Sequence, residues 1–464
     1  MKRSSIICLI VSFLLLFVSC ATTGKFNQAR FDEALFRGEY DTCADMLERK
    51  KESKHNLLKK SLDVNMLRYQ SGDYLASGKG FLESKTIFQK TTGAYTPAMY
   101  VQSAIVNEEN TLYYGPVYER ILTYSMRAID SIKLDALDNA VGVMNDYTGT
   151  YRDIINDLIL KQRQIEDESG NFLENSTVSK SLDMLYKGGI NIDTNKFKAP
   201  KKYQSQYETS PLMSYLGTVV YAAYGDNEHA RDFYSVLKKD NSTLDLSEVL
   251  DVPKNKGHLE VLALSGLIGQ RSECSSKLIF VGAVEGVPIY FKFTYPQFLP
   301  QKHLVDAVEI SLSNGEVKKA ALVENFDAAV LDDVKSKQYG AFNRSVVRNI
   351  VKNATALTTV ISSRILMENA PSDVVRSIAQ ISYNSSRLAF PIAMPLIVDA
   401  EKADIRQAAF FPHMANSAGF SVKPGSYDVT IRYLSKGEVV EEEIIKDVIV
   451  ENGKVTVVAG STAK

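Results

Sequence analysis

The spacing of apolar residues changes once along the chain, near residues 253–257. From residue 26 to residue 240, apolar residues recur every three or four positions and proline is rare, which is typical of amphipathic helices. After this point come short β-branched runs separated by glycine, proline and Asn-Gly pairs, which are typical of antiparallel strands. The pattern predicts an α+β multidomain fold. We expect tetratricopeptide-like helical hairpins at the N-terminus, then an antiparallel β-rich domain with a long helix, and a small C-terminal β-sandwich-like module.

The helical half contains an internal match. Gly38-Glu39-Tyr40-Asp41 and Gly72-Asp73-Tyr74 lie 34 residues apart, which is the period of tetratricopeptide repeats. In such repeats the glycine ends one helix in a left-handed turn, and the aromatic residue begins the next helix. Residues 135–140 and 225–230 fit the same pattern more loosely. The sequence therefore predicts stacked helical hairpins, with insertions between the later ones.

The second half is expected to alternate between strands and one long helix. Strands are predicted at residues 259–264, 277–284, 287–295, 308–312, 317–323, 429–434 and 455–459. Asn314-Gly315 is a strong hairpin signal, because a type I′ turn needs positive φ at both central positions. Residues 401–464 are read as a β-module of their own, entered through Lys423-Pro424-Gly425-Ser426-Tyr427.

A long helix is predicted from residue 327 to residue 368. Its apolar residues, spaced by three or four, form one stripe: Phe342, Val346, Ile350, Ala354, Leu357, Ile361 and Ile365. Arg344, Arg348 and Lys352 lie on another face, which we expect to be solvated; a basic strip meeting phosphate, lipid headgroups or an acidic partner is the alternative. The apolar run at residues 388–398 contains two prolines, and we expect it to be buried or at a sheet edge.

The N-terminus has the pattern of a bacterial lipoprotein leader. Lys2 and Arg3 precede an apolar run at residues 6–18, and Cys20 follows it. The run is shorter than the roughly 20 residues that cross a bilayer, so we expect cleavage of residues 1–19 as a signal peptide and lipidation of Cys20. Ordinary secretion, which would leave Cys20 as a free thiol, is the alternative.

Four segments follow from these patterns. They are the signal peptide at residues 1–19, the tetratricopeptide-like helical domain at 20–250, a mixed β/α domain at 257–400 and the C-terminal β-module at 401–464. Ala21 stands where many bacteria read an inner-membrane retention aspartate, so an outer-membrane destination is favoured. We expect the chain to be held on the bacterial cell envelope by its N-terminal lipid, with the periplasmic or surface face left open.

Charge and cysteine content exclude some classes of function. The formal net charge of −1 becomes −3 when Lys2 and Arg3 leave with the leader, whereas a nucleic-acid-binding protein would be strongly basic. Cys43 and Cys274 remain in the mature body besides Cys20. Two buried thiols are expected, and a disulfide between them is the alternative in an oxidising compartment.

The sequence shows no pattern of catalytic chemistry. The chain has five histidines, and none of them stands at metal-ligand spacing from a Cys, Asp or Glu: His55, His229, His258, His303 and His413. The motifs His-Glu-x-x-His and Gly-x-Ser-x-Gly are also absent from the sequence. We therefore predict no catalytic residues, no metal site, no cofactor and no small-molecule ligand.

Several stretches resemble an uncharacterised family of bacterial lipoproteins with a tetratricopeptide-like helical N-terminal half and a β-rich C-terminal half. They are Tyr113-Tyr114-Gly115 through Tyr124, residues 216–234 with Gly225-Asp226, residues 259–267, residues 304–324 and residues 423–427. The segment 404–412 lacks the tryptophan usual in that family. The resemblance implies a location and an architecture, and it implies no established activity.

The favoured function is a lipid-anchored, non-catalytic cell-envelope adaptor or scaffold that binds protein partners through its helical repeats. Tyr113, Tyr114, Tyr118 and Tyr124 are candidates for lining a partner groove, because tyrosine is enriched at interfaces. The alternatives are a structural surface or assembly lipoprotein, and an accessory factor that binds or modifies cell-wall glycan. An enzyme is not expected, nor is a nucleic-acid partner.

Overall fold

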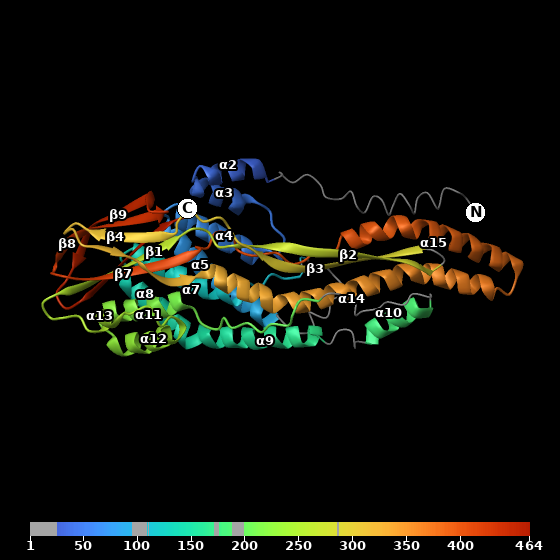
Figure 1. Ribbon diagram of the computed structural model, residues 1–464, viewed down its shortest axis with the longest axis horizontal. Helices are drawn as coiled ribbons and strands as arrows, with labels where there is room; N and C mark the ends of the chain where they lie inside the picture. The colour runs from blue at the N-terminus through green and yellow to red at the C-terminus, as the bar shows by residue number, and fades with distance from the viewer. Residues whose placement is uncertain (1–25, 95–108, 110, 171–175, 188–198, 285–286) are drawn as a thin grey trace.

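The protein is an elongated α/β molecule with a helical N-terminal half and a β-rich C-terminal half (Figure 1). The computed structural model describes residues 26–94, 109, 111–170, 176–187, 199–284 and 287–464. The body at one end combines most of the helices with two sheets, and a narrower arm extends from it (Figure 1). Cys20 and the predicted leader lie outside the described residues.

Helices fill the first half of the chain. They are α2 (Gln28–Phe36), α3 (Tyr40–Arg49), α4 (Leu57–Gln70), α5 (Tyr74–Ala94), α7 (Val117–Lys133), α8 (Leu137–Asp146), α9 (Arg152–Gly170), α10 (Ser176–Lys187), α11 (Pro211–Tyr224), α12 (Asn227–Asp240) and the short α13 (Ser247–Leu250). A single π-helical turn, Tyr147–Tyr151, joins α8 to α9. Helices α3, α4, α5, α7, α8, α11 and α12 each pack on the next one in this order.

One turn geometry recurs at the four places that the sequence pattern marked. Gly38, Gly72, Asp135 and Gly225 have φ of 72°, 86°, 51° and 91° and join α2 to α3, α4 to α5, α7 to α8 and α11 to α12. At each turn two backbone N–H groups close back on the preceding helix; at the second, the Gly72 and Asp73 amides donate to the Tyr69 and Arg68 carbonyls, both at 3.0 Å. The helical hairpins are confirmed, and Asp135 takes the left-handed position where the third lacks glycine.

The strands of the second half form two four-stranded sheets and one long hairpin. They are β1 (Gly257–Ser265), β2 (Gln270–Val284), β3 (Val287–Leu299), β4 (Ala307–Leu312), β5 (Val317–Lys319), β6 (Ala321–Asn325), β7 (Met414–Val422), β8 (Gly425–Ser435), β9 (Glu438–Val450) and β10 (Val455–Thr462). The sheet orders are β10-β1-β7-β6 and β5-β4-β8-β9, with β2 pairing β3. The hairpin predicted at Asn314-Gly315 is confirmed, because β4 and β5 pair antiparallel around it. The prediction of a type I′ turn was wrong, because Gly315 has a φ of 90° but Asn314 does not have a positive φ.

The central strand β1 pairs with strands from a segment that the sequence pattern assigned to a different domain. It pairs with β10 in parallel and with β7 antiparallel, so Val261 lies between Val458 and Ala418. Both neighbours come from residues 401–464, and β4 likewise pairs with β8. Residues 401–464 therefore do not form a sheet of their own, and each four-stranded sheet mixes strands from the 257–400 and 401–464 segments.

Each face of the β1 sheet is covered by a different partner. Side chains alternate along a strand, so Leu262 and Leu264 enter the core shared with the helical half. Val261 faces the opposite side, where it shares a core with Ile310 and Ile431 of the second sheet. The sheet thus forms the middle layer of the body, which explains why every residue of β1 is buried.

The arm consists of β2, β3, α10 and two long helices, α14 (Phe326–Glu368) and α15 (Asp373–Asp399). The predicted long helix is confirmed, and its apolar stripe from Phe342 to Leu357 packs against Phe291 and Phe293 of β3. Ile365, near the outer end of the stripe, is 54% exposed. Among the described residues, no helix has the length and apolarity to cross a membrane.

The basic face predicted on the long helix is buried for two of its three residues. Arg344 and Arg348 are each 1% exposed. Arg348 Nε lies 2.6 Å from Glu401 Oε1, and Lys352 Nζ lies 2.7 Å from the other oxygen of that carboxylate. The solvated-face prediction was wrong, because the chain returns after α15 and places Glu401 over these cations.

The apolar run at residues 388–398 is helical and forms the second half of α15. Pro391 and Pro395 lie inside this helix. Phe390, Met394 and Val398 are buried against the arm, whereas Leu388 is 73% exposed. The segment is therefore not at a sheet edge, and the prediction that it is buried holds for one face of this helix and is wrong for the other.

Candidate functional site

A channel within the helical half holds the extended segment 404–412. The segment has no regular secondary structure, and its residues Gln407, Ala408, Phe410, Phe411 and Pro412 are buried. The Ala408 amide donates to Glu119 Oε1 at 2.8 Å, and the Ala409 amide donates to Asp63 Oδ1 at 2.7 Å. Both carboxylates are buried. Helices α4 and α7 thus bind this backbone as a groove would bind an extended peptide.

Side chains of the segment extend the contact across several helices. The Phe410 ring lies 6.4 Å from Phe31 of α2, and the Phe411 ring stacks on Phe81 of α5 at 6.3 Å. Arg406 donates to Asn56 Oδ1 at 3.1 Å and to the Thr111 carbonyl at 2.8 Å. The channel is therefore occupied by the protein's own chain.

The four tyrosines predicted to line a partner groove lie around this channel or in the core. The Tyr113 ring lies 5.4 Å from the Arg406 guanidinium, and its hydroxyl donates to Glu119 at 2.7 Å. Tyr113, Tyr118 and Tyr124 are 5%, 1% and 0% exposed, and Tyr114 is half-buried. The structure therefore places Tyr113 beside a bound peptide segment, but three of the four rings are closed to an outside partner.

Burial shifts the titration of three acids, Glu119 and Asp130 of the helical half and Glu324 of β6, which packs against it. It raises the pKa of Glu119 to about 7, although the Ala408 amide and the Tyr113 hydroxyl oppose the shift. Burial likewise raises the pKa of Glu324 to about 7 and that of Asp130 to about 8. These carboxyl groups thus take up protons near neutral pH, where exposed acids remain charged.

Sequence reasoning missed Asp63 and Glu119 as the groups that hold the segment. Each lies among apolar residues on its helix, and an acid within an apolar face is seldom buried without a hydrogen-bonding partner. That signal identifies acids that need a partner. It does not identify the partner, which comes from a segment about 290 to 350 residues further along the chain.

An open groove of about 510 Å³ lies on the outside of the second helical hairpin. Val64 and Ile87 contribute apolar surface, and the charged side chains of Lys60, Lys79 and Glu83 surround it. Helices α4 and α5 approach closely beneath it, because a Cβ at Gly80 would lie 1.9 Å from Asn65 Oδ1. The groove combines an apolar floor with a charged rim, which suits a protein segment.

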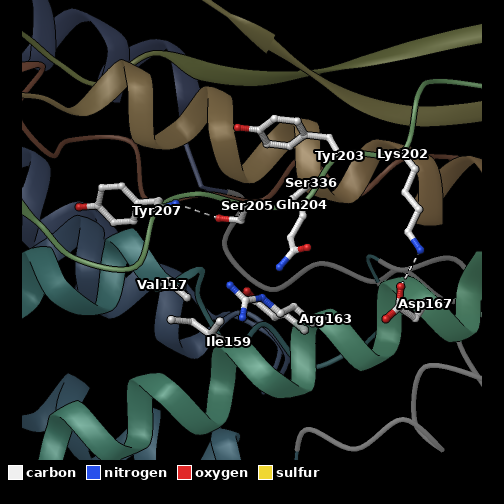
Figure 2. Close-up of a pocket in the computed structure, with 11 residues that line it drawn as sticks. Val117, Ile159, Arg163, Asp167, Lys202, Tyr203, Gln204, Ser205, Tyr207 and Ser336 are labelled. Carbon is white, nitrogen blue, oxygen red and sulfur yellow. Dashed lines mark hydrogen bonds and ion pairs between the residues drawn. The ribbon is translucent and has the colours of Figure 1, made fainter. Parts of the chain in front are cut away.

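A smaller pocket of about 200 Å³ lies between α9, α14 and residues 202–207 (Figure 2). Asp332 of α14 holds the segment 202–207 in place, because its carboxylate accepts hydrogen bonds from the Tyr203 hydroxyl at 2.6 Å and from the Gln206 backbone amide at 3.0 Å. The guanidinium of Arg163 points toward this segment (Figure 2). The volume is below the roughly 300–1,000 Å³ of ligand pockets, so the larger groove is the better candidate for a binding site.

His303, Asp327 and His413 gather where β1, α14 and β7 meet. Their ligand atoms lie within 4.8 Å of one another and could hold a cation. The two imidazole rings stack at 3.4 Å with an interplanar angle of 9°, and both turn a nitrogen to Asp327. Rings stacked in this way direct their lone pairs in parallel and not toward one shared point. Spacing along the chain could not find this group, because its members are far apart in sequence.

The remaining candidate residues have no role in these sites. Cys43 and Cys274 are both free thiols, the first buried and the second half-buried. The disulfide alternative is therefore not formed in this structure. A comparison with protein-family models, curated proteins and solved structures finds no match to this chain.

Proposed function

We propose that the chain is a lipid-anchored, non-catalytic adaptor of the bacterial cell envelope, and that its tetratricopeptide-like helical half binds a protein partner. The observation that carries the proposal is the open groove of about 510 Å³ on α4 and α5. Stacked helical hairpins commonly present such surfaces to proteins or peptides. The motif content of the sequence, which lacks a recognisable catalytic grouping, also favours binding over chemistry.

The outer groove is a better partner site than the inner channel. In the channel, residues 404–412 already satisfy the buried carboxylates of Asp63 and Glu119. An outside peptide would have to replace these bonds and expel a segment that is covalently tied beside them, which gives the segment a high effective concentration. On α5, by contrast, Lys79 and Glu83 are exposed on the rim of the open groove.

The predicted lipid would hold this groove near the membrane. Seven residues lie between Cys20 and the start of α2 at Gln28, which makes eight residue steps. Because an extended chain spans at most about 3.3–3.6 Å per residue, this tether reaches no further than about 30 Å. The first two helical hairpins would therefore stay beside the bilayer, where an envelope protein can meet them.

Co-purification with a reversed rim charge tests the proposal. Tagged wild-type protein and the variants Lys79→Glu and Lys423→Glu are purified from detergent-solubilised envelopes under identical conditions. Lys423 is also exposed, and it lies between β7 and β8 and not among the residues that line the groove. We expect a discrete partner that wild type and Lys423→Glu retain and Lys79→Glu loses at least tenfold. Equal recovery by all three proteins, or no partner after crosslinking, would reject the groove.

The anchor has a separate test. Radiolabelled fatty acid should enter wild-type protein and not the Cys20→Ala variant, which should also leave the membrane fraction. A wild-type chain that stays in the cytosol with residues 1–19 intact would remove the envelope location from the proposal.

A further inference from the structure

Helix α15 carries an uncovered apolar stripe on the outer side of the arm. Its other face packs on α14 and β3 through residues such as Tyr383 and Met394, and Figure 1 shows the helix at the edge of the arm. The stripe is formed by six aliphatic residues that are 62–73% exposed: Val374, Ile378, Ile381, Leu388, Ile392 and Leu396. Exposed aliphatic residues are normal singly, whereas a continuous row marks an interaction surface.

The stripe has the spacing of a helix-pairing seam. With Ser385, its positions are separated by four, three, four, three, four and four residues, close to the alternation of a heptad repeat. At about 100° per residue these positions stay within an arc of about 80°. A seam this narrow fits the side of another helix.

The stripe is nearly symmetric about Ser385. Ile378 and Ile392 lie seven residues to either side, and Val374 and Leu396 lie eleven residues to either side. Ile381 and Leu388 are four and three residues away. In a two-fold interface residue i meets j while j meets i, so an antiparallel copy of α15 would place these pairs opposite each other. The small Ser385 would lie at the centre, where two helices cross most closely.

The charges on α15 fit a second copy better than a lipid surface. The helix carries Asp373 and Asp399 against Arg376 and Arg387, so it lacks the lysine- and arginine-rich polar face of helices that lie on membranes. The antiparallel register brings Asp373 near Asp399 of the other copy. Each is already paired, Asp373 with Arg376 at 3.2 Å and Asp399 with Lys277 at 2.5 Å.

The available area approaches that of a stable dimer. A fully buried aliphatic side chain removes on the order of 100 Å² from water. Six such residues and the small exposed residues beside them therefore offer several hundred Å² on each copy. A standard interface buries about 800 Å² per partner, and α15, about 40 Å long for its 27 residues, offers an area that approaches it.

We propose that the chain forms a homodimer through antiparallel pairing of α15 about a two-fold axis at Ser385. In this dimer the exposed stripe of one copy packs against the same stripe of the second copy. Pairing at the arm leaves the groove on α4 and α5 free, so the dimer would present two partner sites. The inference does not depend on the proposed partner function.

A cysteine at the axis tests the register directly. Full-length protein with Cys274→Ser and Ser385→Cys is compared, in intact producing cells, with a matched chain carrying Gln380→Cys. Gln380 is exposed on the same helix but lies outside the stripe. Helices about 8–10 Å apart with Cα atoms about 2.3 Å from each axis would place the two Ser385 Cα atoms within about 6 Å, which a disulfide can span.

We expect mild oxidation to convert most of the Ser385→Cys chain to a covalent dimer and at least tenfold less of the Gln380→Cys chain. Sedimentation of the full chain should give a dimer for wild type and a monomer for Ile381→Glu/Leu388→Glu, with unchanged circular dichroism. Equal crosslinking of both cysteine variants, or a monomeric wild type, would overturn the proposal. If the monomeric wild type instead binds phosphatidylglycerol vesicles and the double variant does not, the stripe contacts lipid and the dimer is rejected.

Discussion

The helical half and the arm use helices of similar amphipathic spacing in opposite ways. In the helical half, helices α4, α5 and α7 bury their apolar faces against the β1 sheet and around the segment 404–412. In the arm, α15 buries one face and leaves a second apolar face open. The comparison teaches that periodicity identifies a face that needs a partner. Whether that partner is a sheet, a distant segment of the same chain or another molecule depends on the tertiary structure.

The largest expected effect comes from the buried ion pair of the arm. Glu401→Ala removes the buried carboxylate that lies 2.6 Å from Arg348 Nε and 2.7 Å from Lys352 Nζ. Breaking a buried ion pair by removing one partner typically costs about 3–5 kcal/mol of unfolding free energy. The exposed pair Arg364–Glu368 on the same helix, α14, offers a matched control, and Glu368→Ala should cost less than about 1 kcal/mol. Urea denaturation of both variants measures the difference, and equal costs would show that the Glu401 cluster is hydrated.

The corresponding change in the channel removes a ring of the bound segment. Phe411 is fully buried and stacks on Phe81, so Phe411→Ala should lower the unfolding free energy by about 3 kcal/mol or more. Phe36 is 93% exposed, and Phe36→Ala should change it by less than about 0.5 kcal/mol. Thermal unfolding checks both. A small effect of Phe411→Ala would mean that the segment is only loosely held and that the channel is open to outside peptides.

A pH series distinguishes the channel from the surface groove. The folded pKa of Glu119 is raised to about 7, above its ordinary value near 4.3. The folded state therefore binds the proton more tightly, and the stability from this group, present below about pH 4, is lost as pH rises through about 7. We expect the unfolding free energy of wild type to fall by about 2 kcal/mol or more between pH 5 and pH 8, at about 1.4 kcal/mol per unit of pKa shift.

Two glutamine variants assign this slope to the channel. Glu119→Gln should reduce the slope by the share of this one group, because Glu324 and Asp130 also have raised pKa values and keep theirs, whereas Glu83→Gln at the exposed groove should leave it unchanged. Wild-type stability that rises over this range would contradict the raised pKa of Glu119, and so would a slope that Glu119→Gln does not alter.

The smallest effect concerns the turns that the four helical hairpins share. Gly72 has a φ of 86° and Asp135 has a φ of 51°. Gly72→Ala should lower the unfolding free energy by about 1 kcal/mol, because a Cβ disfavours the left-handed region. Asp135→Gly should raise it by less than about 1 kcal/mol, because glycine relieves that strain but loses more entropy on folding. Chemical denaturation of the two variants tests whether both turns need the same left-handed backbone. If both substitutions change the unfolding free energy in the same direction, the two turns are not equivalent.

Local features of the fold could be predicted from the sequence. The glycines at 38 and 72 and the looser matches at 135 and 225 all mark real turns between helices. Asn314-Gly315 and the apolar stripe from Phe342 to Leu357 also lie where expected. These features succeed because each depends on residues only a few positions apart.

Long-range partners could not be predicted in the same way. The parallel pairing of β1 with β10, the burial of Arg348 by Glu401 and the filling of the channel by residues 404–412 each join positions separated by dozens to hundreds of residues. The four tyrosines predicted to line a partner groove show where local patterns stop being informative. Tyr113 does lie at the channel that holds an extended segment, but no nearby residue indicates that this segment belongs to the same chain. The exposure of α15 was likewise hidden, because an apolar helix face has the same sequence pattern whether or not it is covered.

Photo-crosslinking from the groove tests the central claim most directly. A photoreactive amino acid is placed at Glu83, on the rim of the α4–α5 groove, or at Glu438, an exposed residue of β9, and intact cells are irradiated. We predict a discrete adduct with a different envelope protein from position 83, which Lys79→Glu suppresses, and none from position 438. No adduct at position 83, or the same adducts from both positions, would contradict an adaptor that binds its partner through this groove.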